Sequence, residues 1–247
     1  MPTKYLLARC ILQGAFDHDT MESRTEKKYV LDMAHALLAQ TILSAHCLPD
    51  PSFARGTVHS IYFDTLDLQF LSEKIDSTYF KAKIRLRWYG NWDFLPDDGP
   101  AFLEAKIKEG GLQRKVRLPM TSTGRELAHL PLGSPELAAL PTLLAAQGIG
   151  LCASVRPVFV ISYRRMRFID PMTGTRIALD QNIHAPRHAL SCPGTCGSPM
   201  LPLAVIETKG TLARLPQYLA PLVTMGLRPD SFSKYLHCYQ SLMQQPM

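Results

Sequence analysis

Ionisable side chains stand at every second position in one stretch of this chain, and this alternation restricts the fold more than any other feature. Residues 81–87 read Lys-Ala-Lys-Ile-Arg-Leu-Arg, so cations and apolar residues take turns. Successive side chains of a β-strand point to opposite faces of the sheet. The stretch therefore predicts a strand with one cationic face and one apolar face.

The same alternation recurs in other segments, and each of them predicts a strand with one charged face. The charged members are Arg24, Glu26 and Lys28; Glu104, Lys106 and Lys108; Lys115 and Arg117; Arg165 and Arg167; Arg176 and Asp180; and Glu207 and Lys209. One such strand is explained by an antiparallel sheet with a buried face and a solvated face. Its repetition favours a closed sheet, which turns one face inward and the other outward.

The pattern predicts a mainly β (α+β) fold, an eight-stranded antiparallel β-barrel with flanking helices. The predicted strands span residues 24–31, 57–64, 80–89, 101–108, 113–119, 157–169, 175–180 and 202–209. Turn residues at 97–100 and 109–111 are typical of hairpins, so neighbouring strands are expected to pair antiparallel. Helices are predicted over 34–46, capped by Asp32, and over 67–74, 134–147 and 233–243. Residues 184–202, rich in Pro, Gly, Ser and Cys, predict a long irregular segment.

Length and composition are compatible with one domain spanning residues 1–247. With 46% hydrophobic residues the chain can bury a core, and barrels of this length commonly form one domain. The net charge of +6 and the pI near 9.0 favour an anionic partner without naming it.

Cysteine, histidine and apolar patterning indicate a reduced, soluble, cytoplasmic protein. The six cysteines are scattered, and Cys192 and Cys196 have no second pair to complete a zinc site. His184 and His188 are spaced as metal ligands can be, but a proline interrupts the segment, which disfavours a metal site. For Cys192 and Cys196, a surface loop of reduced thiols is favoured. We find no signal peptide and no apolar run of the roughly 18 residues that a membrane span needs.

The charged face has a chemical consequence if helices cover the apolar face of the sheet. Cations enclosed in a barrel are costly without a counter-charge, so a bound polyanion is expected. Arginine can hold two phosphate oxygens at once, while lysine supplies compact charge. Glutamates among these cations repel phosphate, and their natural role is to hold Mg²⁺ or Mn²⁺.

A series of segments, in this order, resembles one known family, the VTC (vacuolar transporter chaperone) domain. This domain is a polyphosphate polymerase module of the triphosphate tunnel metalloenzyme superfamily. The resemblance covers about residues 24–239, in the segments 24–29 (RTEKKY), 60–65 (SIYFDT), 83–90 (KIRLRWYG), 102–106 (FLEAK), 115–117 (KVR), 163–168 (YRRMRF), 176–180 (RIALD), 205–209 (VIETK) and 231–235 (SFSKY).

The resemblance implies an eight-stranded tunnel barrel that transfers the γ-phosphate of ATP onto a polyphosphate chain, with Mn²⁺ or Mg²⁺. The implied partners are ATP and inorganic polyphosphate, phosphate or pyrophosphate. The residues at the family's phosphate-binding, catalytic positions are Arg85, Arg87, Lys106, Lys115, Arg165 and Arg176. We assign substrate binding to Arg24, Lys28, Lys83, Arg117, Lys209, Ser233 and Lys234. The metal-binding carboxylate is Glu207, joined by the acidic positions Glu26 and Glu104.

Three features depart from the family pattern. Arg167 stands where the family usually has a small residue, and it either adds a cation or points outward. The segment from Cys192 to Cys196 has no counterpart. The chain also lacks the phosphate-sensing domain and membrane segments of the eukaryotic complex, so coupling of synthesis to transport is not implied.

Two alternative functions stay open. The first is hydrolysis of tripolyphosphate or a nucleoside triphosphate in the same tunnel. Relatives with that activity begin with Glu-x-Glu-x-Lys, whereas Arg24 replaces the first carboxylate here, which leaves fewer groups to activate water. The second is a binding module without turnover, for polyphosphate or for nucleic acid. Trp88, Tyr89 and Trp92 could stack on bases, but RNA-binding signatures are missing.

Overall fold

The computed structural model describes residues 25–93, 98–110, 112–151, 154–190, 200–210 and 215–243. These residues form one sheet whose strands all pair antiparallel, in the order β10-β1-β9-β8-β7-β3-β4-β5-β6, with β2 beside β7. The strands are β1 (Thr25–Asp32), β2 (Leu48–Pro49), β3 (Arg55–Asp64), β4 (Phe80–Gly90), β5 (Pro100–Glu109), β6 (Leu112–Thr123), β7 (Arg156–Ile169), β8 (Arg176–His188), β9 (Leu203–Gly210) and β10 (Pro229–Asp230).

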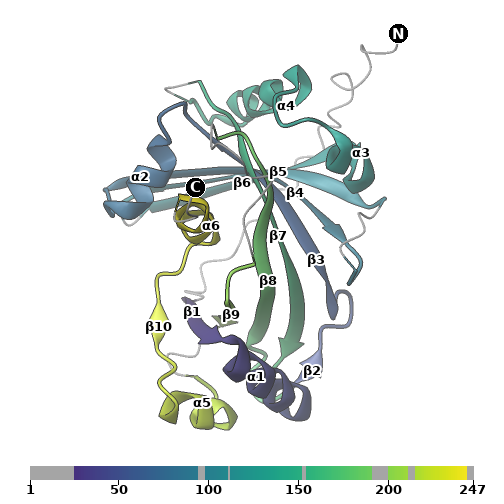
Figure 1. Cartoon of the computed structure of the whole chain (residues 1–247), viewed down its shortest axis with the longest axis vertical. Helices are drawn as coiled ribbons and strands as arrows, with labels where there is room; N and C mark the ends of the chain where they lie inside the picture. The colour runs from purple at the N-terminus through teal and green to yellow at the C-terminus, as the bar shows by residue number, and fades with distance from the viewer. Residues whose placement is uncertain are drawn as a thin grey trace.

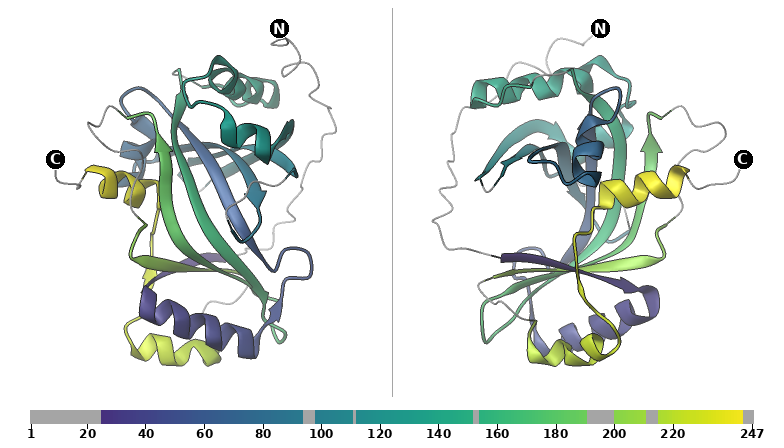
Figure 2. Two further views of the ribbon diagram at one scale, coloured as in Figure 1. Left: turned by 45° about the vertical axis from the view of Figure 1, so that its right-hand side comes forward. Right: turned by 90° about the vertical axis from the view of Figure 1, so that its left-hand side faces the viewer.

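Helices pack on both sides of this curved sheet (Figure 1). They are α1 (Met33–His46), α2 (Gln69–Ile75), α3 (Gly124–His129), α4 (Pro135–Ala139), η1 (Leu140–Gln147), η2 (Gln217–Leu219), α5 (Ala220–Thr224) and α6 (Lys234–Met243). Figure 2 shows α4 above one half of the sheet, α1 and α5 below the other half, and α6 between the two halves. We call the face that α1, α3 and α4 cover the outer face, and the opposite face the inner face. No helix among the described residues has the length and apolar character needed to cross a membrane.

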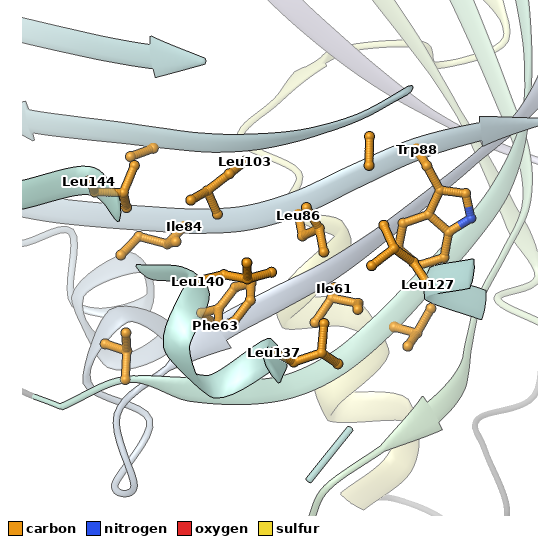
Figure 3. Packing of buried hydrophobic residues seen from close by; sticks show 14 of the residues in the cluster. Ile61, Phe63, Ile84, Leu86, Trp88, Leu103, Leu127, Leu137, Leu140 and Leu144 are labelled. Carbon is orange, nitrogen blue, oxygen red and sulfur yellow. The ribbon is translucent and has the colours of Figure 1, made fainter. Parts of the chain in front are cut away.

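The outer face of β3, β4 and β5 buries the apolar members of the alternating segments. Ile84, Leu86 and Trp88 are at most 1% exposed, and they lie with Leu103 and Leu137 in one hydrophobic cluster under α3, α4 and η1 (Figure 3). Burying a leucine-sized side chain contributes about 2 kcal/mol. This packing fixes the strand faces, and it leaves Lys83, Arg85 and Arg87 on the inner face.

Two further clusters complete the core. One lies under α1, η2 and α5 and includes Leu43, Ile177 and Ile206. The other lies on the inner side, where side chains of α6 and α2, such as Tyr235 and Leu71, pack on apolar side chains of the sheet such as Phe159. The inner face is therefore apolar at the end that α6 covers and charged elsewhere.

The predicted strands and their antiparallel pairing are confirmed, as is the sheet-rich fold with flanking helices. The closure differs, because the sheet of the described residues is open between β6 and the β1 end. The short strand β10 occupies the free edge of β1, where Lys28 pairs with Asp230 and Tyr29 with Pro229. The edge of β1 is therefore paired with β10 at these two residues, and not with β6.

Two local predictions need correction. The helix expected over 134–147 is a short α-helix followed by a 3₁₀ helix from Leu140, because Pro141 has no N–H to donate and so favours a tighter turn. The segment expected to be irregular from residue 184 begins as strand, since β8 continues to His188 beside the long β7. Register shifts in β7 accommodate this extension. The other predicted helices are confirmed with boundary shifts of one or two residues, and Asp32 does cap α1.

Candidate functional site: a charged inner face between two walls

The inner face carries two groups of ion pairs, which come from different strands. We call Arg85 and Arg87 of β4, Glu104 of β5 and Arg117 of β6 the arginine wall. We call Arg165 of β7, Asp180 of β8, Glu207 of β9 and Glu26 of β1 the carboxylate wall. Both groups follow from the strand register, which pairs Arg85 with Glu104, Glu104 with Arg117, and Arg165 with Asp180.

In the arginine wall the Glu104 carboxylate forms ion pairs with three guanidinium groups. Arg85 Nε donates to Glu104 Oε2 at 2.6 Å. Arg87 Nη1 lies 3.9 Å from the same oxygen, and Arg117 Nε lies 3.6 Å from Glu104 Oε1. Burial alone would raise the pKa of Glu104, but the surrounding guanidinium groups outweigh it and hold the pKa below its ordinary value. This wall has an excess of positive charge.

Arg87 links the arginine wall to the carboxylate wall. Its Nε donates to Ser60 Oγ at 3.1 Å, and its Nη2 donates to the hydroxyl of Tyr163 at 3.4 Å. The ring of Tyr163 in turn lies beneath two further cations, with Lys234 Nζ 4.6 Å and Arg165 Cζ 5.3 Å from its centroid. Cations from three elements, β4, β7 and α6, thus meet at this tyrosine.

In the carboxylate wall Arg165 is held between two carboxylates. Its Nε and Nη2 donate to the two oxygens of Asp180 at 2.6 and 2.7 Å, and Nη2 also donates to Glu207 Oε2 at 3.0 Å. Burial raises the pKa of each carboxylate, but the cations outweigh it, so both pKa values lie below the ordinary range, that of Glu207 well below. The Arg165 pKa lies well above its ordinary value despite burial, chiefly because of Asp180.

Glu26 and Glu207 are the carboxylates best placed to share a metal ion. Lys209 Nζ lies 3.5 Å from Glu26 Oε2 and 3.3 Å from Glu207 Oε1, so one ammonium group joins the two carboxylates. Lys28 Nζ lies 3.8 Å from Glu26 Oε1 and donates to the carbonyl of Phe232 at 3.3 Å. Within the described ranges no group of three or more His, Cys, Asp and Glu side chains could hold a metal ion. Two carboxylates fit Mg²⁺ or Mn²⁺ when phosphate oxygens and water complete the shell.

A row of lysines extends the inner face toward the open edge of the sheet. The register places Lys83 beside Lys106 and Lys106 beside Lys115. Desolvation by burial, together with nearby cations and against a raising effect of Tyr62, lowers the pKa of Lys83 to about 8. Clustered ammonium groups of this kind attract an anion.

The two ends of the open sheet face one another across this row. The pKa of Lys106 is lowered by partial desolvation first, and then by its interactions with Lys115, Lys28 and Lys209, while Glu26 acts in the opposite direction. These groups belong to β6, β1 and β9, at both ends of the strand order. Charged groups from both ends of the open sheet therefore act on Lys106.

The remaining predicted site residues lie at the rim, on α6 or outside the description. Lys234 Nζ reaches Asp180 Oδ2 at 2.6 Å, whereas the Ser233 hydroxyl accepts from Leu236 N at 3.4 Å in the first turn of α6. Arg176 is exposed at the first position of β8, and Lys115 is exposed within β6, opposite Lys106. Arg24 and the segment from Cys192 to Cys196 lie outside the described residues. Arg167, the departure from the family pattern, shares a face with Arg165 and donates to the Phe53 carbonyl at 3.1 Å.

The sequence pattern gave no binding or catalytic role to four side chains that the inner face brings in: Ser60, Tyr62, Tyr163 and Asp180. Tyr163 alternates with Arg165 and Arg167, and Asp180 is spaced by four from Arg176, so period-two spacing was the signal that could have found them. Tyr62 stands directly opposite Arg85. Burial raises its pKa, but Lys83, Arg85, Arg87 and Lys234 outweigh this and lower it to about 7.

Comparison with known proteins places the chain in a family. A protein from Hippeastrum, proposed as an adenylyl cyclase and reported to have a dominant triphosphatase activity, matches with 14% identity over 87% of this chain and 94% of its own, at a TM-score of 0.48. Proposed adenylate cyclases from Vibrio parahaemolyticus and Bacillus halodurans match with 12% and 16% identity. Their TM-scores are 0.43 and 0.41, with coverage of 90% and 81% of this chain and 98% and 84% of theirs. No curated protein matches the chain significantly. The VTC domain model matches residues 23–243, so the resemblance is confirmed and the chain belongs to the VTC domain family.

Proposed function

We propose that the protein is a metal-dependent polyphosphate polymerase, which transfers the γ-phosphate of ATP onto a polyphosphate chain held along the inner face. The observation that carries this proposal is the convergence of cations from both walls on Tyr163. Arg87 donates to its hydroxyl at 3.4 Å, and Lys234 and Arg165 lie over its ring. An extended triphosphate fits this arrangement, because it presents several negative charges in a row.

Phosphoryl transfer suits a site of this composition, because it depends mostly on positioning and charge stabilisation. The guanidinium groups would hold the phosphoryl oxygens in bidentate pairs. Glu26 and Glu207 would hold Mn²⁺ or Mg²⁺, which would supply positive charge to neutralise the charge that develops during transfer. The terminal oxygen of the acceptor phosphate would attack the γ-phosphorus of ATP in line. The bond from that phosphorus to the β–γ bridging oxygen would break, and ADP would leave with that oxygen.

The low pKa values of three inner-face carboxylates favour transfer to phosphate over transfer to water. Hydrolysis needs a base that can take a proton from water. Glu104 is engaged by the arginine wall, Asp180 by Arg165 and Lys234, and Glu207 by Arg165 and Lys209. Because cations hold the pKa values of all three below the ordinary value, each is a weak base.

The test is the length of the phosphate product. The protein is incubated with ATP and Mn²⁺ or Mg²⁺, with and without pyrophosphate as primer, and the product is resolved by gel electrophoresis. We expect chains of many phosphates. Orthophosphate as the sole product would overturn the proposal in favour of a triphosphatase, and binding of tripolyphosphate without any product would indicate a binding module.

A matched pair of variants tests whether the polymer is made at the inner face. Arg87→Ala removes a cation of the arginine wall, and we expect a loss of about 10²- to 10³-fold in rate, as for one preorganised donor. Arg125→Ala removes an arginine of α3 that pairs at the surface with Asp98 at 2.7 Å, and we expect its rate to stay near that of the wild type. Near wild-type polymer yield from Arg87→Ala would contradict the assignment.

A further inference from the structure

Asp180 is a fully buried carboxylate at the boundary between the sheet and the C-terminal helix. Its residue is 0% exposed, and its oxygens accept from Arg165 at 2.6 and 2.7 Å and pair with Lys234 Nζ at 2.6 Å. A buried carboxylate with two cations is costly to assemble, and removing one partner leaves an uncompensated charge. Its presence in an inner face that attracts polyanions therefore calls for a specific role.

A second buried carboxylate makes a parallel contact with the next residue of α6. Asp64, also 0% exposed, accepts from the hydroxyl of Tyr235 at 2.8 Å. It also accepts from the backbone N–H of Thr65 at 2.8 Å and, at the start of α2, from those of Phe70 at 2.8 Å and Leu71 at 3.0 Å. The consecutive residues Lys234 and Tyr235 are thus each held by a buried carboxylate, one on β8 and one on β3.

The two contacts differ in what else they touch. Tyr235 stacks on Tyr62 at 5.2 Å and lies in the apolar part of the inner side, so its bond to Asp64 docks the helix. Asp180 instead holds two cations that both lie over the ring of Tyr163, at 4.6 Å for Lys234 Nζ and 5.3 Å for Arg165 Cζ. A guanidinium group with two donors fixed by one carboxylate has its orientation fixed as well.

We propose that Asp180 is a positioning residue, which orients Arg165 and Lys234 toward the phosphates and thereby makes docking of α6 a part of assembling the site. This inference rests on the proposed function and adds to it the carboxylate that holds two of its cations. Asp180 itself does not contact the substrate, because both of its oxygens are engaged by the two cations.

The experiment compares Asp180→Asn with Tyr235→Phe. The first keeps the shape of the side chain and removes its charge; the second removes the hydroxyl that bonds to Asp64 and so weakens docking of α6 without altering a cation. For each variant, calorimetry with inorganic tripolyphosphate gives the affinity and the fraction of binding-competent protein, and the polymer assay gives the rate per competent site. A thermal melt records the loss of stability.

For Asp180→Asn we expect a rate per competent site that is lower by about tenfold or more, since misplacing reacting groups is costly. Its tripolyphosphate affinity should not fall, because the number of cations is unchanged and one negative charge is removed. Tyr235→Phe should keep the wild-type rate per competent site. An Asp180→Asn rate equal to that of the wild type, or an equal loss in the two variants, would refute the positioning role and leave the proposed function intact. Absence of any product from the wild type would refute both.

Discussion

The two walls of the inner face differ in how their clustered charges are compensated. The arginine wall surrounds Glu104 with three guanidinium groups, so positive charge is left over for a ligand. The carboxylate wall sets Asp180, Glu207 and Glu26 against Arg165 and nearby lysines, so its charges nearly balance. From this difference we propose that phosphate binding falls to the wall with an excess of cations, and metal binding to the wall that holds Glu26 and Glu207.

The largest expected difference between the walls is in stability. Arg165→Ala leaves the buried Asp180 and Glu207 without their shared partner, and we expect a loss of about 3 kcal/mol in the free energy of unfolding. Arg85→Ala leaves Glu104 beside Arg87 and Arg117, so we expect about 1 kcal/mol. Urea denaturation of both variants at pH 7 checks the ranking, and equal losses would mean that the walls do not differ in this way.

The next prediction concerns the metal. Glu207→Gln removes one of the two carboxylates that lie together, and we expect the Mn²⁺ concentration for half-maximal activity to rise about tenfold or more. Glu104→Gln is the matched control, because its carboxylate is engaged by the arginine wall, and we expect its metal requirement to stay unchanged. A shifted metal requirement in Glu104→Gln alone would move the metal to the other wall and contradict our division of roles.

Acid stability gives a third contrast. The pKa values of Glu104, Asp180 and Glu207 are depressed in the folded protein. Each carboxylate therefore contributes stability that is present above its unfolded pKa of about 4 and is lost as the pH falls through the folded pKa. In Asp180→Asn the stability should fall less steeply below pH 4 than in the wild type, by about 1 kcal/mol over this range. Denaturation curves at pH 7 and pH 3 measure it, and parallel curves for the two proteins would contradict the assignment.

The smallest expected effect is the alkaline weakening of anion binding. The pKa of Lys83 is about 8 and that of Tyr62 about 7, so raising the pH neutralises the lysine and ionises the tyrosine. Both changes reduce the positive charge of the inner face, and we expect tripolyphosphate affinity to fall about threefold to tenfold between pH 7 and 9. Lys83→Arg should remove the part that lies above pH 8, and Tyr62→Phe the part around pH 7. Calorimetry across this range is the measurement, and affinity independent of pH in the wild type would refute it.

Much of the fold and of the two walls could be predicted, because the direction of a side chain in a strand is set by its position in the local sequence. The period of two alone placed Arg85 and Arg87 opposite Leu86, and Leu86 is indeed buried on the outer face. The antiparallel pairing followed from short turns for the same reason. Such features depend on residues that are neighbours in the sequence.

What could not be predicted depends on contacts between distant residues. Asp180 meets Lys234 because α6 packs across the inner side, 54 positions later in the chain. The edge of β1 pairs with β10 instead of β6. Because β10 has only two residues, no alternation in the sequence reveals it. Glu104 was assigned to the metal, and the structure surrounds it with arginines, because charge alone does not distinguish a carboxylate that binds metal from one that holds cations. That assignment remains a prediction, which the Mn²⁺ titration described above tests.

The most direct test is a crystal structure with tripolyphosphate and Mn²⁺. Our account predicts phosphates between the two walls, in contact with Arg85, Arg87 and Arg165, and the metal on Glu207 and Glu26. A triphosphate bound elsewhere, or a metal held by Glu104 within the arginine wall, would contradict it.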